Sequence, residues 1–435
     1  MLETLKSMLL DFQEMSLETG VPRRLKVQAV PGKATVCIGV RRSGKSTYLF
    51  QVIERLRREG VPCENILYVN FFDDRLHNLE REGLGLITEA YYSLYPEKKN
   101  TETVYCFFDE IQTVDGWEPF VDRMMRTEQC EMYLTGSSAR MLSREIATQM
   151  RGRALSWEIF PFSFREFLDF EGIDSAEPLS TKKRLIIQKA FDEFWEKGSF
   201  PEVAGLERQL RIKTHQEYFQ AVLFRDVVER HDVSHPNAVR DLAHRLLENI
   251  ASLYSVNGLT GYLKSLGHRA PKAAVADYLD WFEDAYFLFT TLIFDASAAR
   301  RKTNPKKVYC IDHALVSSVA SGILVNSGHL LENLVFTALR RVNPEIHYYK
   351  TKNGLEVDFV AQPHDGPRLL VQVCESMASP KTRKREVTAL STAMSELRLD
   401  SGTIVTRDEE SEISDAGGTI RIVPAWRFLL DMSDA

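Results

Sequence analysis

Residues 34–46 read ATVCIGVRRSGKS and decide the fold of the N-terminal part of the chain. Residues 34–38 are apolar and rich in β-branched side chains, a composition typical of a buried strand. Residues 39–46 match the pattern GxxxxGK[ST], and the residues from 47 onward have the apolar spacing of a helix. A strand, a glycine-containing turn and a helix in this order predict a phosphate-binding P-loop.

The residue types of this turn suit a nucleoside triphosphate. Glycines let backbone N–H groups face phosphate oxygens, and the start of the following helix adds a favourable dipole. Lys45 is expected to act in catalysis by reaching the β- and γ-phosphates, and the Ser46 hydroxyl is expected to ligate Mg²⁺. ATP and Mg²⁺ are therefore the predicted cofactors, and the predicted nucleotide-binding residues are Gly39, Arg42, Ser43, Gly44, Lys45, Ser46 and Thr47.

Two further apolar segments end in polar side chains that suit nucleotide hydrolysis. Residues 103–110 read TVYCFFDE, and residues 131–138 read EMYLTGSS. In P-loop enzymes the first arrangement supplies an aspartate for Mg²⁺ and a glutamate that polarises the attacking water, which predicts these roles for Asp109 and Glu110. Active groups gather at the carboxyl ends of parallel strands. Ser137 and Ser138 are therefore candidates to sense the γ-phosphate, and helix capping is the alternative for each.

An arginine is expected to stabilise transition-state charge, either in its own subunit or from a neighbouring one. The candidates are Arg151, Arg153 and Arg225. The alternative for each is a surface ion pair. An arginine supplied by a neighbouring subunit would imply a homo-oligomer, although the sequence shows no recognisable oligomerisation motif.

Seven segments spread over nearly the whole chain resemble the AAA-type ATPases of bacteria and archaea that carry a C-terminal domain of uncharacterised function. They are GVRRSGKS at 39–46, FDEI at 108–111, TGSS at 135–138, RGRAL at 151–155, FSFREF at 162–167, GSFPEV at 198–203 and KVYCIDHAL at 307–315. The resemblance implies a winged helix in the middle of the chain and a restriction-endonuclease-like fold at its end.

The predicted fold class is α/β, with a parallel-sheet P-loop ATPase core and a helical lid, followed by a winged helix and a small α/β endonuclease-like domain. The expected segments are an N-terminal helical arm (1–32), the ATPase core (33–160), the lid (161–235), the winged helix (236–320) and the last domain (321–435). Apolar residues at helical spacing predict lid helices over 182–195 and 216–231.

Residues 255–311 have the rhythm of a helix-turn-helix followed by a wing. Helices are expected over 255–267 and from residue 272, and strands over 287–294 and 307–311. Phosphate contacts are expected at the start of the second helix and in the wing, from His268, Arg269, Lys272, Arg300, Arg301, Lys302 and Lys306. A deeper fit in the major groove would be repelled by acidic side chains of the same helix, namely Asp277, Asp280, Glu283 and Asp284. Any DNA contact is therefore expected to be structure-selective rather than sequence-specific.

The last 110 residues resemble metal-dependent nucleases at two positions out of three. Glu332 on an expected helix and Asp358 in an expected hairpin match the first two carboxylates. The third motif departs from (D/E)xK, because Gln372 replaces the acid and Cys374 replaces the lysine. A neutral amide is a weak Mg²⁺ ligand and a thiol cannot replace an ammonium, so the site is predicted to be degenerate and nuclease activity is not expected.

A basic run follows this region. Residues 381–385 read KTRKR, so Lys381, Arg383, Lys384 and Arg385 place four positive charges within five residues. The run is either a segment that grips a phosphate backbone or a solvated helix face.

The composition is that of an ordinary globular protein. The chain has 435 residues, a net charge of −6 from 55 basic and 61 acidic side chains, and 44% hydrophobic residues. This excludes a mostly disordered chain, a small disulfide scaffold and a globally basic nucleic-acid coat. The six scattered cysteines fit thiols in a reducing compartment. The start lacks signal-peptide features and no run is apolar enough to span a bilayer, so a soluble, cytoplasmic protein without membrane contact is expected.

Together these patterns predict a Mg²⁺-dependent ATPase that couples ATP binding and hydrolysis to DNA binding or remodelling. Branched or single-stranded DNA is the favoured partner. Two alternatives stay open: a signalling or scaffold ATPase that binds protein partners, and an ATP-gated nuclease.

Overall fold

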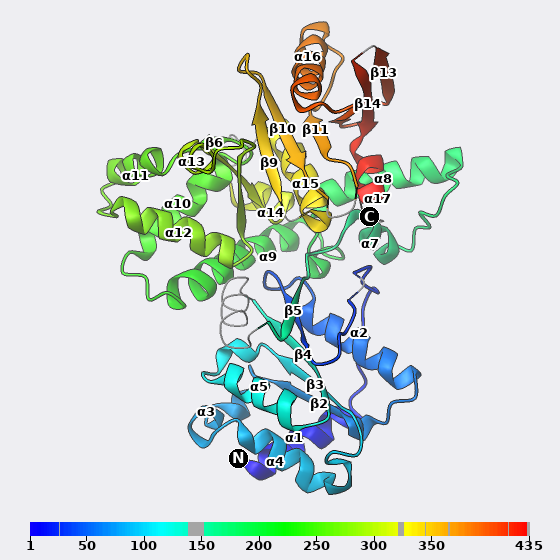
Figure 1. The fold of residues 1–435 in the computed structure, drawn as a ribbon, viewed down its shortest axis with the longest axis vertical. Coiled ribbons are helices and arrows are strands. Elements are labelled where there is room, and N and C mark those ends of the chain that lie inside the picture. The colour runs from blue at the N-terminus through cyan, green and yellow to red at the C-terminus, as the bar shows by residue number, and fades with distance from the viewer. Residues whose placement is uncertain are drawn as a thin grey trace. The chain divides into compact units, whose positions relative to one another are not determined.

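The computed structural model describes residues 1–25, 27–137, 152–320, 326–343, 345–363, 366–415 and 417–432. The chain forms two compact units, and Figure 1 labels many of their helices and strands. Unit 1 contains Met1–Phe160 and Asp284–Tyr286, and unit 2 contains Pro161–Glu283 and Phe287–Ala435. The division into two units does not test the boundaries within either unit, so the five predicted segments stay a prediction.

Unit 1 is built around a parallel sheet with the strand order β2-β3-β4-β1-β5. All its neighbouring strands pair in parallel. The strands are β1 (Ala34–Ile38), β2 (Ile66–Asn70), β3 (Val104–Asp109), β4 (Cys130–Gly136) and β5 (Ala154–Glu158). The predicted parallel sheet is confirmed, and β5 is a strand that the sequence pattern did not reveal.

Unit 1 also contains helices before and between these strands. They are α1 (Leu2–Glu14), α2 (Lys45–Arg58), α3 (Leu79–Glu82), α4 (Gly85–Leu94) and α5 (Trp117–Thr127), with short 3-10 turns η1 (Cys63–Asn65), η2 (Asp74–Leu76), η3 (Pro96–Lys98) and η4 (Ile111–Thr113). The predicted N-terminal arm is helical only in α1, and its described residues after Glu14 form neither helix nor strand.

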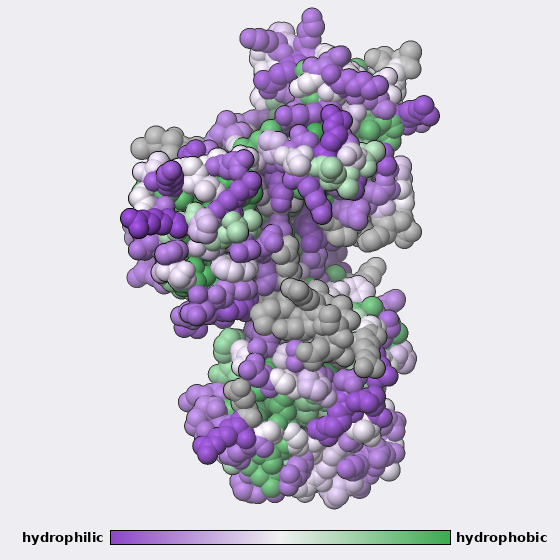
Figure 2. Space-filling view, turned by 60° about the vertical axis from the view of Figure 1, so that its left-hand side comes forward, coloured by the Kyte–Doolittle hydropathy of each residue, from purple (hydrophilic) through white to green (hydrophobic). Residues whose placement is uncertain are grey.

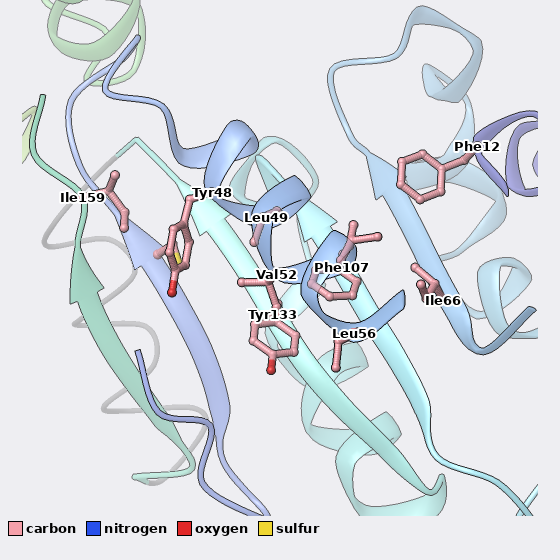
Figure 3. Packing of buried hydrophobic residues seen from close by; sticks show 11 residues of the cluster. Phe12, Tyr48, Leu49, Val52, Leu56, Ile66, Phe107, Tyr133 and Ile159 are labelled. Carbon is pink, nitrogen blue, oxygen red and sulfur yellow. The ribbon is translucent and has the colours of Figure 1, made fainter. Parts of the chain in front are cut away.

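Alternate residues of β3 pack on opposite faces of the sheet. Phe107 belongs to the hydrophobic cluster under α2, where it stacks on Tyr133 with ring centroids 4.7 Å apart (Figure 3). Phe108 faces the other side and contacts Phe120 of α5 at 5.8 Å. A parallel strand covered by helices on both faces is hydrophobic throughout, which explains why residues 104–108 lack polar alternation.

Unit 2 contains a nine-stranded mixed sheet with the order β13-β14-β12-β11-β10-β9-β7-β8-β6. Its strands are β6 (Leu253–Tyr254), β7 (Leu288–Ile293), β8 (Lys306–Cys310), β9 (Ile346–Lys350), β10 (Glu356–Ala361), β11 (Leu369–Val373), β12 (Ser401–Thr406), β13 (Ser411–Asp415) and β14 (Gly418–Pro424). The β7–β8 hairpin joins the later strands through a parallel pairing of β7 with β9. One sheet therefore runs through both of the segments predicted as winged helix and C-terminal domain.

The helices of unit 2 are α7 (Phe164–Phe170), α8 (Thr181–Lys197), α9 (Arg208–Ala221), α10 (Pro236–Glu248), α11 (Val256–Ser265), α12 (Lys272–Asp284), α13 (Ala298–Thr303), α14 (His313–Val319), α15 (Ser327–Val342), α16 (Pro380–Leu397) and α17 (Ala425–Met432), with the 3-10 turn η5 (Pro201–Val203). The prediction of one helix over 216–231 is wrong in detail, because α9 starts earlier and continues into the π-helix η6 (Val222–Glu229). The predicted wing loop contains α13.

The buried Asp312 carboxylate joins two of the segments that carry the family resemblance. One of its oxygens accepts hydrogen bonds from the backbone N–H and the hydroxyl of Ser199, both at 2.6 Å. The other accepts the N–H of Leu315 at 2.7 Å and so caps α14. Segments 198–203 and 307–315 are thus joined by buried hydrogen bonds inside unit 2.

None of the helices within the described residues is long and apolar enough to cross a membrane. On the face shown in Figure 2, hydrophilic residues predominate and hydrophobic residues form small areas between them. All six cysteines are free thiols, and Cys37, Cys106 and Cys310 are buried.

Gly198 has no room for a side chain, because it packs against Asp312 and Ala314. Its φ is +82°, and an added Cβ would lie 2.7 Å from the Ala314 Cβ and 2.8 Å from an Asp312 carboxylate oxygen. We expect Gly198→Ala to lower the free energy of unfolding by about 3 kcal/mol, because left-handed strain and overpacking add. Urea unfolding followed by tryptophan fluorescence measures this loss.

Gly267→Ala is the matched control. Gly267 has a similar φ of +87° but nothing within 4 Å of an added Cβ. Gly267→Ala should lower the free energy of unfolding only by the cost of the left-handed conformation, about 1–2 kcal/mol. Equal losses for the two variants would contradict the packing role of Gly198.

Candidate functional site

The P-loop backbone adopts conformations that few residues other than glycine tolerate. Gly44 has φ +94° and Arg42 has φ +64°. A Cβ on Gly39 would lie 2.3 Å from the Ile159 carbonyl oxygen, so only glycine fits there. The turn ends at Lys45, the first residue of α2. The first N–H groups of a helix have no partner inside it, which makes this end of α2 an anion-binding site.

The Lys45 side chain is buried at the centre of this turn. Its ammonium donates to the carbonyl oxygens of Gly39 and Val40, both at 3.1 Å. The side chain is 4% exposed, and its Nζ lies 3.7 Å from a carboxylate oxygen of Glu110. The structure therefore brings together two of the predicted catalytic residues, and a buried ammonium of this kind favours an anionic ligand.

Asp109 ends β3 and is held by hydroxyl groups from both neighbouring strands. One of its oxygens accepts the Thr135 hydroxyl of β4, and the other accepts the Tyr68 hydroxyl of β2 at 3.0 Å. Burial and the Asp109 charge hold the pKa of Tyr68 well above its ordinary value, so this hydroxyl stays a donor. With an exposed fraction of 1%, the Asp109 carboxylate is held in one orientation by these two hydrogen bonds.

Thr135 also positions the neighbouring glutamate. The backbone N–H of Glu110 donates to the Thr135 hydroxyl oxygen at 2.9 Å. Glu110 has a left-handed φ of +54°, and its carboxylate accepts the side-chain amide of Gln112 at 2.6 Å. Residues in such strained conformations cluster at functional sites, where surrounding contacts maintain them.

The donor set fits a triphosphate with a divalent cation. Ser46 lies in the first turn of α2, and Asp109 lies at the end of a strand two positions away in the same sheet. Hydroxyl and carboxylate oxygens are ligands that Mg²⁺ prefers. The Ser43 hydroxyl is buried and has no hydrogen-bond partner among the described residues, as expected of a group that faces a ligand.

Within unit 1, Arg153 is the arginine candidate that the structure describes, and it does not lie beside the P-loop. The Arg153 carbonyl accepts a hydrogen bond from the N–H of Ala34 at the start of β1, and its guanidinium pairs with Asp122 at 3.1 Å. The P-loop follows the opposite end of β1, roughly 16 Å away along five extended residues. This placement does not bring Arg153 to the P-loop of its own chain, and a role in a neighbouring subunit stays a prediction.

The remaining candidates near the nucleotide are placed as follows. Ser137 is buried and directly follows β4, whose Gly136 pairs with Ile38 before the P-loop. Arg225 is exposed on η6 of unit 2. Arg151 and Ser138 lie outside the described residues.

Sequence reasoning missed the groups that position the acidic pair. Tyr68 and Thr135 carry no motif of their own, although both stand near the carboxyl ends of strands beside β3, which is the signal that could have found them. It also missed Arg23, whose guanidinium donates to the Ser43 carbonyl at 3.1 Å and to the Phe160 carbonyl. Arg23 thus ties the N-terminal arm to the P-loop.

The basic candidates of unit 2 differ in exposure. The exposed ones are Arg269, Lys272, Arg300, Lys302, Lys381, Arg383, Lys384 and Arg385, whereas Arg301 and Lys306 are half-buried. Arg300 pairs with Asp295 at 3.1 Å, and Arg385 pairs with Glu386. His268 contacts Asp241 at 2.7 Å, so its predicted availability for phosphate is reduced.

The predicted degenerate nuclease positions are partly brought together. Glu332 and Asp358 both contact the buried Lys307 ammonium at 2.9 Å, which sequence reasoning did not foresee. Gln372 accepts the Asp358 N–H at 3.2 Å and donates to Glu386. Cys374 points elsewhere, with its thiol donating to the Ser376 carbonyl.

Three family models match parts of this chain. The family model described as "AAA domain" matches residues 31–168, and two domains of unknown function, DUF8612 and DUF4143, match residues 188–324 and 327–428. A structure titled as a Walker-type ATPase of Pyrococcus abyssi is similar with a TM-score of 0.43 and 13% identity, over 72% of this chain and 94% of that one. Nothing about function follows from a likeness of that size.

Two relatives are similar in sequence, and both are described as uncharacterised. A protein of Haemophilus influenzae is 29% identical over 76% of this chain and 80% of its own length. A protein of Methanocaldococcus jannaschii is 33% identical over 98% of this chain and 95% of its own length. The chain therefore belongs to the same family as the Methanocaldococcus jannaschii protein, and its N-terminal unit has an AAA-type P-loop ATPase fold.

Proposed function

We propose that the chain is a Mg²⁺-dependent ATP hydrolase that couples nucleotide turnover to nucleic-acid binding. The observation that carries the hydrolase is the joint placement of Lys45 and the Asp109–Glu110 pair, with Nζ 3.7 Å from the Glu110 carboxylate. A protein that only stores nucleotide has no need for a strained, half-buried glutamate beside the phosphate-binding lysine. This geometry favours hydrolysis.

Each residue of the site has a distinct expected role. Lys45 has three N–H donors, and the two that now go to carbonyl oxygens would bind the more basic phosphate oxygens instead. Ser46 and Asp109 would hold Mg²⁺, whose charge offsets that of the phosphates. Glu110 would accept a proton from, or orient, the attacking water. Gln112 keeps the Glu110 carboxylate in place.

The first test removes the lysine and the glutamate separately. Lys45→Ala should lose nucleotide binding and turnover together, because the phosphates lose their buried cation. Glu110→Gln should still bind ATP but lower kcat at least about 10²-fold, because the general base is lost. Phosphate release and binding of a fluorescent ATP analogue measure the two effects. Glu59→Gln, at an exposed position after α2, is the control. Wild-type turnover by Glu110→Gln would contradict the assignment.

A second test examines the positioning role of Thr135. Thr135→Val removes the hydroxyl that binds the Asp109 carboxylate and the Glu110 N–H, and should lower kcat about 10–100-fold with little change in KM for ATP. Thr135→Ser keeps the hydroxyl and should restore turnover. If the serine variant is as slow as the valine variant, packing and not the hydrogen bonds explains the loss.

The nucleic-acid part of the proposal rests on unit 2. The order α10, β6, α11, α12, β7, β8, with the three strands in one sheet, is the order of a winged helix. Arg269 and Lys272 are exposed at the start of α12, whereas Asp277 and Asp280 are exposed farther along the same helix. Phosphate contact at the helix start is therefore favoured over insertion of the helix into a groove.

The start of α16 supports the same conclusion. The first turns of this helix carry Lys381, Arg383, Lys384 and Arg385 and no acidic residue in the first turn. Positive charge at a helix N-terminus opposes the helix dipole and costs about 0.3–1 kcal/mol per group. A phosphate backbone would relieve this repulsion and bind the exposed N–H groups of the same turn.

Salt dependence tests this contact. Each phosphate-binding cation makes the slope of log K against log salt more negative by about 1. Arg383→Ala/Lys384→Ala should therefore make the slope less steep by about 2. Anisotropy of labelled single-stranded, duplex and branched DNA measures the slope. Lys182→Ala/Lys189→Ala, two exposed lysines of α8, is the matched control. If DNA alters neither ATP turnover nor nucleotide affinity, the coupling to DNA is wrong and a switch that binds proteins takes its place.

A further inference from the structure

Unit 2 contains a buried cation bound by three carboxylates. The Lys307 side chain of β8 is 4% exposed, and its Nζ lies 2.9 Å from carboxylate oxygens of Glu332, Glu356 and Asp358. An ammonium has three N–H donors, so each donor has one carboxylate partner. Glu332 comes from α15, and Glu356 and Asp358 come from β10. Carboxylates from two elements of the fold therefore surround the one cation on β8.

Neighbouring groups hold the carboxylates in this arrangement. The Tyr309 hydroxyl donates to the Glu332 oxygen that binds Lys307, at 2.7 Å. The backbone N–H of Val373 donates to the second oxygen of Asp358 at 2.9 Å. Hydrogen bonds from Tyr309 and Val373 thus orient the Glu332 and Asp358 carboxylates independently of Lys307.

The charges of this cluster depend on the lysine. Burial and the Asp358 charge raise the pKa of Glu332 to about 8, and Lys307 opposes that rise. Burial works against the Lys307 ammonium, but the negative groups around it, including Asp358, Glu332 and Glu356, hold its pKa above the ordinary value. The Lys307 ammonium therefore supplies the positive charge that offsets the negative charge of this cluster.

The geometry points to Lys307 as an internal replacement for a divalent metal ion: we propose that its ammonium occupies the position where Glu332, Glu356 and Asp358 would otherwise bind such an ion. The wild-type site then binds no divalent metal and cuts no phosphodiester bond. Among the described residues, no group of three or more His, Cys, Asp or Glu side chains is arranged to hold a metal ion, so the three carboxylates would have to move closer together to bind one. This inference does not depend on ATP hydrolysis.

The positions around the cluster agree with a site closed by lysine. Gln372 uses its amide to bridge the Asp358 N–H and the buried Glu386, a role that needs no metal. The N–O distances of 2.9 Å exceed the 2.3–2.6 Å of Ca²⁺ sites by roughly 0.5 Å. Small side-chain shifts would therefore let the three carboxylates close on a divalent ion once the ammonium is removed.

The test compares Mn²⁺ binding by nucleotide-free wild type and Lys307→Met, a change that removes the ammonium and keeps an unbranched side chain one atom shorter. Mn²⁺ bound per chain is counted by electron paramagnetic resonance, and any ion at the P-loop is common to both proteins. Lys307→Met should bind one more equivalent than wild type, and Mn²⁺ should raise its Tm. Lys350→Met is the matched control, since Lys350 is 41% exposed and lies 3.8 Å from Glu356. It should bind as wild type does.

Two further measurements keep the proposal falsifiable. If Lys307→Met does not fold even with Mn²⁺, Lys307→Met/Glu356→Gln restores the net charge of the wild-type cluster and should still bind Mn²⁺ through Glu332 and Asp358. A folded variant that gains no Mn²⁺ overturns the proposal. So does wild-type protein that cleaves supercoiled DNA with Mg²⁺ or Mn²⁺ and loses this activity in Asp358→Ala.

Discussion

The geometry of the nucleotide site depends on one buried carboxylate. Asp109 is 1% exposed, and a carboxylate removed from water must be hydrogen-bonded on both oxygens. The hydroxyls that satisfy it come from Tyr68 on one neighbouring strand and Thr135 on the other. Three parallel strands are thereby aligned at their carboxyl ends. The same threonine binds the backbone of Glu110, so the alignment extends to the residue that faces Lys45.

Unit 2 also pairs its carboxylates with groups from other parts of the fold. Asp312 is buried and satisfied by Ser199 and Leu315, which joins α14 to the turn after α8. Glu332, Glu356 and Asp358 are satisfied by one ammonium. A buried charge is destabilising unless it is paired, so each of these groups restricts how neighbouring elements can pack. The cationic partner of Glu332, Glu356 and Asp358 is Lys307 of the same chain.

Much of unit 1 could be predicted because its signals are local. The strand, turn and helix around Gly39, Gly44 and Lys45 form one continuous segment, and Asp109 and Glu110 end an apolar run of the length of a strand. The edge strand β5 was missed because ALSWE has no clean apolar pattern. The π-helix after α9 was missed because a helical apolar spacing does not distinguish hydrogen bonds to residue i−4 from those to i−5.

Residue types and their spacing along the chain were sufficient for the P-loop, for the acidic pair after β3 and for the α/β class, because backbone geometry places residues that are close in sequence. Pairing between distant segments required the tertiary structure. Arg153 was a candidate for the nucleotide, but strand direction places it at the far end of β1. Lys307 was regarded as the first residue of a wing strand, yet it is buried between carboxylates 25 and 51 residues later in the chain. Which charges meet in the interior depends on how strands and helices pack, and no local pattern encodes that.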